Sequence, residues 1–309
     1  MIIVSILLLI AGFVMLVKGA DWFVDGSASL ASRLGIPQLV IGLTIVAMGT
    51  SLPEAAVSIT AAIKGNAGIS IGNVLGSNIL NILIILGITA VIVPVAVQKS
   101  TLLYEIPFML VITGVLLVMG VTGQMVTHVE GVILWGFFVA YLVYLYFLSK
   151  QSKDEEPEEK KEMPVWKCLL LIVIGGVLIV LGSDFAVKGA SELARMFGIS
   201  ERFIGLTIVA LGTSLPELVT SVTAARKGNA DIAIGNIVGS NIFNILFVLG
   251  TSALICNIPY AVSFRVDAVI GILAGVLLWL LGIRKKELRR GGGIALLAAY
   301  AVYFVYLCQ

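Results

Sequence analysis

Ten long apolar stretches, separated by shorter polar segments, set the pattern of this 309-residue chain. Each is long enough for a helix to cross a bilayer, which takes roughly 17–25 mostly apolar residues. One longer polar stretch, 150–163, carries charges of both signs and divides the ten into two groups of five. The pattern predicts an all-α polytopic membrane protein with spans near 2–20, 37–63, 70–95, 102–121, 129–149, 165–187, 203–226, 232–256, 265–283 and 292–308.

Composition agrees with a membrane protein. Mean hydropathy is +1.09 and 12% of residues are charged, against about 25% in soluble domains. We expect the first span to be retained, because no basic segment precedes it and no small-residue cleavage site follows. Three scattered cysteines without a CxxC motif predict neither a disulfide framework nor a thiolate metal site. The lipid bilayer is the expected environment, and we expect no nucleic-acid partner and no cofactor.

An internal repeat links the two groups of spans. GLTIVAMGTSLPE at Gly42–Glu54 recurs as GLTIVALGTSLPE at Gly205–Glu217, which is 163 positions later. Between 41–87 and 204–250, 34 of 47 aligned positions are identical without a gap. A repeat of this length is evidence for two related structural units. We therefore divide the chain into a first five-helix repeat (1–149), a linker (150–164) and a second five-helix repeat (165–309).

The basic residues predict an orientation. With ten spans, 15 of the 20 Lys and Arg residues fall on one side of the membrane and 5 on the other. The positive-inside rule places the side with 15 in the cytoplasm, so the linker faces in and both termini face out. Five spans per repeat also means that the second repeat enters the membrane inverted. Inverted repeats are common in secondary transporters, whose substrate sites lie near the midplane at the repeat interface.

The second and seventh spans carry signs of a break. Pro53 lacks an N–H, so the Gly49 carbonyl loses its helical partner, and glycine weakens a helix by roughly 1 kcal/mol. Gly212 and Pro216 repeat the arrangement. We expect both spans to be broken or strongly kinked there. Freed carbonyls at that depth are tolerated where they line a cavity or meet a ligand.

Each break lies beside a glutamate, Glu54 or Glu217, within apolar sequence. Intramembrane carboxylates are costly and are functional by default, and no Lys or Arg lies near either one in its span. Thr50 and Ser51 precede Glu54 by four and three residues, spacings that share a helix face. Carboxylate, hydroxyl and carbonyl oxygens are the ligands of hard cations such as Na⁺ and Ca²⁺.

The third and eighth spans add a polar stripe each. Asn73, Ser77 and Asn81 are spaced at i, i+4 and i+8, and the second repeat carries the same stripe at Asn236, Ser240 and Asn244. Asn78 and Asn241 lie off these stripes. For these two, and for Asn73 and Asn236, hydrogen bonding between helices is an equally good interpretation. Asp21, Asp25 and Asp184 are interpreted as solvated interfacial charges or as helix-end partners at the ends of the first and sixth spans.

Enzymatic alternatives find little support. A metalloprotease would need a histidine pair such as HExxH, and the chain has one histidine, His128. The spans also lack the Ser–His or Ser–Lys pair of an intramembrane serine protease. We therefore expect a transporter that is not an enzyme. A cation channel stays open as a less favoured alternative and would pass current without a counter-ion.

GTSLPE with a downstream GSN..N, present once in each half, resembles the two inverted α-repeats of the calcium/cation antiporter superfamily. The similarity is greatest to prokaryotic sodium/calcium exchangers and covers all ten spans and the linker. It implies Na⁺-driven Ca²⁺ antiport by alternating access, with the first and sixth spans as a sliding gate. Mapped onto this chain, the resemblance implies that Glu54, Glu217, Thr50 and Thr213 bind Ca²⁺. It implies further cation ligands at Ser51, Ser77, Ser214, Ser240, Asn81, Asn244 and the carbonyls of Ala47 and Ala210.

One position departs from some family members, which carry aspartate in place of Asn244. With asparagine at both 81 and 244, the site holds two formal negative charges, which balance one Ca²⁺ or two Na⁺. K⁺ co-transport and the Na⁺:Ca²⁺ stoichiometry therefore stay open. A Ca²⁺/H⁺ exchanger is the main alternative, because protonation of both glutamates could replace Na⁺. We expect a monomer in the plasma membrane.

Overall fold

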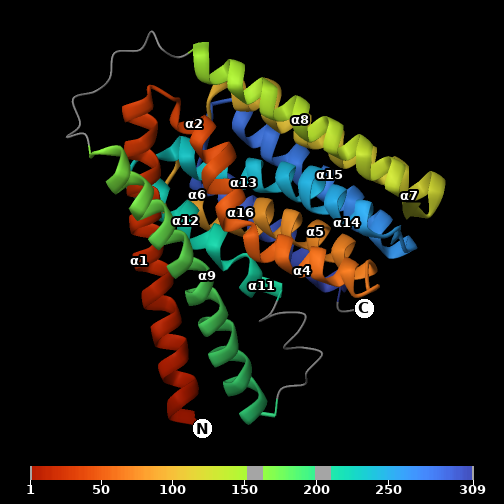
Figure 1. The fold of residues 1–309 in the computed structure, drawn as a ribbon, viewed down its shortest axis with the longest axis horizontal. Helices are drawn as coiled ribbons and strands as arrows, with labels where there is room; N and C mark the ends of the chain where they lie inside the picture. The colour runs from red at the N-terminus through yellow and green to blue at the C-terminus, as the bar shows by residue number, and fades with distance from the viewer. Residues whose placement is uncertain (1, 152–162, 199–209, 308–309) are drawn as a thin grey trace.

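The computed structural model describes residues 2–151, 163–198 and 210–307, and this part of the chain is almost entirely helical (Figure 1). Short π-helical segments, labelled η, interrupt several helices. The first half contains α1 (Ile2–Leu34), α2 (Gln38–Ile41), η1 (Gly42–Val46), α3 (Ala47–Thr50), α4 (Leu52–Ile63), α5 (Gly68–Leu80), η2 (Asn81–Ile85), α6 (Leu86–Ile92), β1 (Val95–Ala96), η3 (Thr101–Glu105), α7 (Ile106–Gly123), β2 (Met125–Val126) and α8 (His128–Gln151).

The second half repeats this order. It contains α9 (Val165–Met196), α11 (Ala210–Thr213), α12 (Leu215–Arg226), α13 (Ala230–Phe243), η6 (Asn244–Leu249), α14 (Gly250–Ile255), β3 (Ile258–Pro259), α15 (Val262–Ile283), β4 (Glu287–Leu288) and α16 (Arg290–Leu307).

The predicted all-α membrane fold is confirmed. Among the described residues, eight helices are long and apolar enough to cross a membrane, and the bent pair formed by Gln38–Thr50 and Leu52–Ile63 makes a ninth. The predicted seventh span, 203–226, begins outside the described residues, which contain only its later parts α11 and α12. The described helices therefore fit the predicted order of ten spans, of which the seventh is described only in part.

Two predicted spans were too short. The first was expected to end near 20 and the sixth near 187, but α1 continues to Leu34 and α9 to Met196. Asp21, Asp25 and Asp184 consequently lie within long helices, where each is partly exposed and paired with a lysine. The difference in helix length arose because the apolar run stops where these helices continue with charged residues.

Helices α1 and α9 are equivalent in the repeat and run side by side in opposite directions (Figure 1). Their contact is lined by glycines. A Cβ added to Gly12 would lie 2.7 Å from the Gly182 carbonyl oxygen, and one added to Gly19 would lie 2.8 Å from that of Gly175. Gly175 and Gly182 are the repeat counterparts of Gly12 and Gly19, 163 positions later. Gly12 therefore packs near the counterpart of Gly19, and Gly19 packs near the counterpart of Gly12. Equivalent helices that pack antiparallel confirm that the two repeats are inverted.

Two short sheets also join the halves. β1 pairs antiparallel with β4, and β2 pairs antiparallel with β3. Each sheet connects a loop of the first repeat to a loop of the second, so both loops of a pair lie on the same side of the membrane. The ten-span order predicts the same grouping of these four loops.

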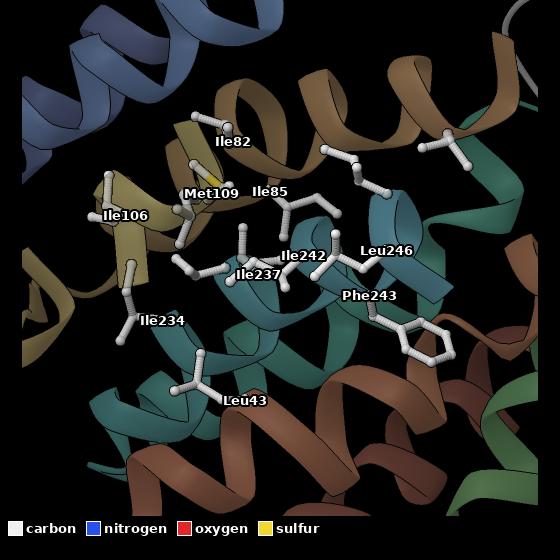
Figure 2. Close-up of a cluster of buried hydrophobic side chains, with 14 of the residues drawn as sticks. Leu43, Ile82, Ile85, Ile106, Met109, Ile234, Ile237, Ile242, Phe243 and Leu246 are labelled. Atoms are coloured by element: carbon white, nitrogen blue, oxygen red, sulfur yellow. The ribbon is translucent and has the colours of Figure 1, made fainter. Parts of the chain in front are cut away.

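The hairpins that carry the polar stripes form the centre of the molecule. The span containing α13 and α14 is 94% buried and that containing α5 and α6 is 72% buried, whereas the six other straight spans are 17–44% buried. Figure 2 shows Ile234, Ile237 and Ile242 of α13 packed between Leu43 of η1 and Ile82 of η2. Apolar packing on all sides fixes the positions of the polar groups in these helices.

Candidate cation-binding site

Both candidate glutamates follow a break in a helix, as predicted. Ser51 interrupts the second span between α3 and α4, where the helix axis bends by 51°. Ser214 interrupts the seventh in the same way between α11 and α12. Glu54 and Glu217 lie in the first turns of α4 and α12. The positive end of each half-helix dipole therefore points toward its carboxylate, which favours negative charge there.

The two repeats hold each other's carboxylates. The Ser51 hydroxyl donates to Glu217 Oε1 at 2.8 Å, and the Ser214 hydroxyl donates to Glu54 Oε1 at 3.2 Å. Both glutamate side chains are fully buried. The other oxygen of each, Oε2, has no hydrogen-bond partner among the described residues. Each carboxylate is thus anchored through one oxygen and leaves the second available to a ligand.

Neither glutamate forms an ion pair with a basic residue of the described part of the chain, although the two carboxylates interact electrostatically with each other. Burying an unpaired charge costs several kcal/mol, and like charges repel strongly where the dielectric constant is low. A cation that contacts both carboxylates removes both costs. The arrangement therefore favours occupation by a cation or by protons.

Four asparagines lie at the centre of the interface between the repeats. The amide of Asn78 donates to the backbone carbonyl of Asn241 at 3.1 Å, and Asn241 donates to that of Asn78 at the same distance. Their side-chain oxygens accept hydrogen bonds from Asn244 Nδ2 at 3.1 Å and from Asn81 Nδ2 at 3.0 Å, respectively. The Oδ1 atoms of Asn81 and Asn244 have no partner among the described residues. Because the network uses the Nδ2 atom of Asn81 and of Asn244, the atom that each side chain leaves without a partner is its oxygen.

Asn73 and Asn236 hold the half-helices in place. Asn73 Nδ2 donates to the Ser58 hydroxyl at 2.9 Å, and Asn236 Nδ2 donates to the Ser221 hydroxyl at 2.9 Å. Asn236 Oδ1 also accepts a 2.9 Å hydrogen bond from Thr50 Oγ1 of the other repeat. All these amides join one helix to another, so the alternative of structural hydrogen bonding applies to Asn73 and Asn236.

Most of the remaining predicted ligands are buried. Thr50, Ser51, Ser77, Ser214 and Ser240 are buried, whereas Thr213 is only half-buried. Thr50 and Thr213 lie close enough to Glu217 and Glu54, respectively, to interact with their carboxyl groups.

The two predicted carbonyl ligands, Ala47 and Ala210, have different surroundings in the structure. The Ser240 hydroxyl donates to the Ala47 carbonyl at 3.3 Å, so these two predicted ligands are neighbours. The structure describes the backbone of Ala210 within α11, which packs against the helix α5 that carries Ser77. The side chain of Ala210 lies outside the described residues.

Two features of the site were not predicted. The first is the orienting role of Asn78 and Asn241, which the identical GSN in both repeats could have indicated. The second is that π-helical segments begin at Asn81 and at Asn244. Single π turns inside α-helices occur frequently at functional sites, but no sequence signal marks these two.

The unpaired oxygens define the chemistry of the site. They are Oε2 of Glu54 and Glu217 and Oδ1 of Asn81 and Asn244, with serine and threonine hydroxyls nearby. Among the described residues, no group of three or more His, Cys, Asp or Glu side chains could hold a metal ion. An all-oxygen set with two carboxylates suits Ca²⁺ or Na⁺ rather than a soft transition metal.

Comparison with known proteins agrees with this geometry. The family model described as sodium/calcium exchanger protein matches residues 4–147 and 167–309. The chain is 35% identical to sodium/calcium exchanger MaX1 of Methanosarcina acetivorans, over 99% of both sequences. It is also 35% identical to inner membrane protein YrbG of Escherichia coli, over 97% of this chain and 95% of that protein. A solved structure of the sodium-calcium exchanger NCX_Mj, soaked with Na⁺ and without Ca²⁺, superposes with a TM-score of 0.86 at 34% identity over 99% of both chains.

Proposed function

The chain belongs to the sodium/calcium exchanger protein family, and from this premise we propose that it is a secondary antiporter that exchanges Na⁺ for Ca²⁺. The observation that carries the proposal is the pair of buried carboxylates, one from each repeat, with no basic partner in the described part of the chain. One Ca²⁺ neutralises this pair, and so do two Na⁺.

The electrostatics supply the coupling. Two bare carboxylates in a buried site repel each other, and an uncompensated charge inside a membrane costs at least about 2.5 kcal/mol. The empty site is therefore a poor species for crossing between the two access states. When Ca²⁺ leaves, another cation must replace it before the transporter reorients, and this requirement makes the process exchange rather than leak.

We propose Na⁺ rather than H⁺ as the counter-ion on the basis of the family, and the neutral ligands supply the oxygens that Na⁺ would need. A proton needs only the carboxylate that it protonates, whereas a metal ion needs several oxygens around it. The Asn78–Asn241 network keeps the Oδ1 atoms of Asn244 and Asn81 available as such oxygens. The site residues Glu54, Glu217, Thr50 and Thr213 would contact Ca²⁺. The flanking serines, Asn81, Asn244 and the carbonyls of Ala47 and Ala210 would complete the Na⁺ sites.

The two repeats, 1–149 and 165–309, are joined by the linker 150–164 and share the site. Their first helices, α1 and α9, act as the sliding gate that opens this site to one face of the membrane or the other. The distribution of Lys and Arg supports a plasma-membrane orientation with the linker in the cytoplasm and both termini outside. One chain suffices as the transporting unit, because it supplies both carboxylates.

A flux experiment in proteoliposomes tests the proposal. ⁴⁵Ca²⁺ uptake is measured with an outward gradient of Na⁺, of H⁺ or of K⁺, with the other two ions equal on both sides. We expect uptake driven by the Na⁺ gradient at clamped pH. Uptake that follows the H⁺ gradient and ignores Na⁺ would show a Ca²⁺/H⁺ exchanger instead, and uptake without any counter-ion gradient at zero voltage would show a channel.

A further inference from the structure

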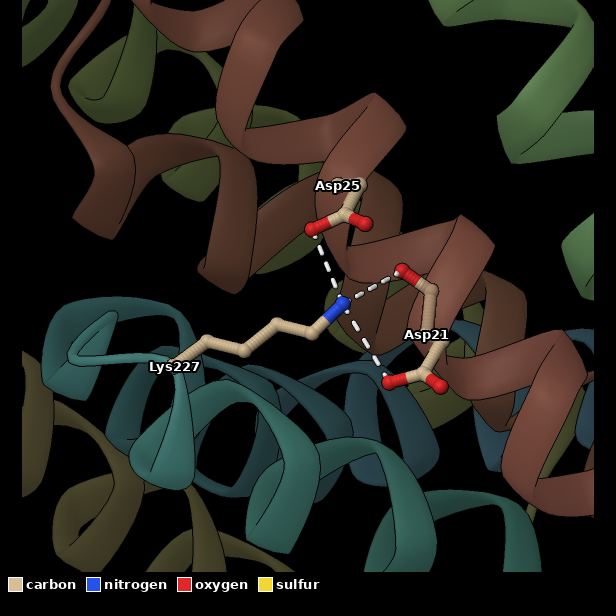
Figure 3. Close-up of polar contacts among 3 residues, drawn as sticks. All are labelled: Asp21, Asp25 and Lys227. Atoms are coloured by element: carbon tan, nitrogen blue, oxygen red, sulfur yellow. Dashed lines mark hydrogen bonds and ion pairs between the residues drawn. The ribbon is translucent and has the colours of Figure 1, made fainter.

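An ion-pair cluster joins α1 to the end of α12 (Figure 3). The ammonium of Lys227, directly after α12, lies 2.9 Å from Asp25 Oδ1 and 3.2 Å from Asp21 Oδ1. It also donates to the backbone carbonyl of Asp21 at 3.1 Å. The Lys227 side chain is 29% exposed. Since α12 begins beside Glu217, the cluster ties the helix that leads from the ion site to one of the two long helices α1 and α9.

The other repeat carries a different set of charges at the equivalent positions. Adding or subtracting 163 gives Asp184, Lys188 and Lys64 as the counterparts of Asp21, Asp25 and Lys227. The lysine at 188 pairs with Asp184 within α9, at 2.6 Å. Lys64 is exposed and forms no ion pair with any residue of the described ranges. The second half thus lacks the cluster because it has Lys188 where the first half has Asp25.

Packing follows the same asymmetry. Helix α1 packs along α12, whereas the equivalent pair, α9 and α4, makes few contacts. In a transporter built from inverted repeats, the two pairs lie toward opposite faces of the membrane and exchange roles as access alternates. Among the described residues, the α1–α12 face is therefore the more closely packed of the two, and the α9–α4 face is the less closely packed.

We propose that Asp21, Asp25 and Lys227 form a latch that holds the α1–α12 face closed, and that Lys188 leaves the α9–α4 face without one. The two faces of the otherwise symmetric transporter are thereby unequal in energy, and the resting protein favours closure at the latched face. On the predicted orientation this is the cytoplasmic face. The inference rests on the alternating access of the proposed function, but its test reads conformation rather than transport.

Two spin-label pairs at equivalent positions report on the two faces. Leu34 with Arg226 spans the latched face, and Phe197 with Ile63 spans the other; all four are exposed. Labels are attached to cysteines in a background where the native cysteines are alanine, and distances are measured by pulsed electron spin resonance. We expect Lys227→Gln to raise the ratio of open to closed forms at the latched face by roughly 1.4- to fivefold for each of the two ion pairs lost, the range for exposed ion pairs. Lys227→Arg, which keeps the charge, should leave the ratio near that of the parent.

The reverse change builds a latch on the other face. Lys188→Asp recreates the acidic pair opposite Lys64, so the Phe197–Ile63 distance should shift toward a closed form. Adding Lys64→Gln to that variant should cancel the shift, which excludes a general effect of the Lys188 change.

Unchanged distances at both faces in Lys227→Gln and in Lys188→Asp, in protein that elutes as a folded species, would overturn the proposal. Ca²⁺ flux measured on the same samples separates this result from the fate of the proposed function. Distances that respond as expected without any Na⁺-driven Ca²⁺ uptake would leave the latch in place and reject the antiport.

Discussion

Glu54 and Glu217 differ from the other fully buried acid among the described residues, Glu105 of η3. Glu105 accepts a hydrogen bond from the Tyr144 hydroxyl of a neighbouring helix of the same repeat. The two site glutamates instead accept hydrogen bonds across the interface between the repeats. Glu105 therefore has its partner within its own repeat, whereas Glu54 and Glu217 have partners in the opposite repeat, as the proposed shared site requires.

Glu54→Gln or Glu217→Gln is expected to lower Na⁺-driven ⁴⁵Ca²⁺ flux at least about tenfold, a loss of ~1.4 kcal/mol or more in Ca²⁺ stabilisation. Each change removes one of the two formal charges that balance Ca²⁺. Flux in proteoliposomes measures the effect. Glu105→Gln, which removes a buried carboxylate outside the site, is the matched control and should retain most of the flux. Wild-type flux in either site variant would refute the assignment.

Asn244→Asp is expected to preserve transport and change its ion coupling. The substitution adds a third negative charge and removes the N–H group that donates to Asn78. A site with three charges holds an additional monovalent cation more readily. The Na⁺ Hill coefficient and the current per Ca²⁺ should both change, and Asn81→Asp is the matched variant in the other repeat. If neither quantity moves in Asn244→Asp, this residue lies outside the coupling site.

At the scale of elements, the sequence predicts most of the helices and both breaks in them. The 51° bend at Ser51 follows from the glycine and proline on either side of it. The extension of α1 to Leu34 and of α9 to Met196 was missed, because hydropathy reports contact with lipid and not helix length. The π turns at Asn81 and Asn244 were missed because they arise from packing at the centre of the molecule.

The glycine contact between α1 and α9 predicts that alanine has opposite effects on thermal stability at two glycine positions. A Cβ on Gly182 would lie 2.8 Å from the Gly12 carbonyl oxygen, whereas one on Gly136 of α8 meets no atom within 4 Å. Alanine is favoured over glycine in a helix by about 1 kcal/mol, but overpacking costs typically 1–3 kcal/mol. Gly182→Ala should therefore lower the apparent Tm and slow exchange, while Gly136→Ala should leave the Tm equal or higher. Thermal unfolding in detergent measures both, and equal behaviour of the two variants would show that close α1–α9 packing is unimportant.

At the scale of the whole molecule, the repeat in the sequence predicts that two halves share one site. The inverted packing of α1 against α9 and the crossed Ser–Glu hydrogen bonds agree with it. The sequence does not predict the conformation in which the halves meet, because both access states have the same local structure. That difference depends on contacts between distant residues, such as Lys227 with Asp21 and Asp25.

Equilibrium ⁴⁵Ca²⁺ binding to the purified protein in Na⁺-free buffer tests the shared site most directly. The account predicts one Ca²⁺ per chain, displaced by added Na⁺, and complete loss of this binding in Glu54→Gln and in Glu217→Gln alike. Two Ca²⁺ per chain, with one retained after either substitution, would show two independent sites and contradict the account.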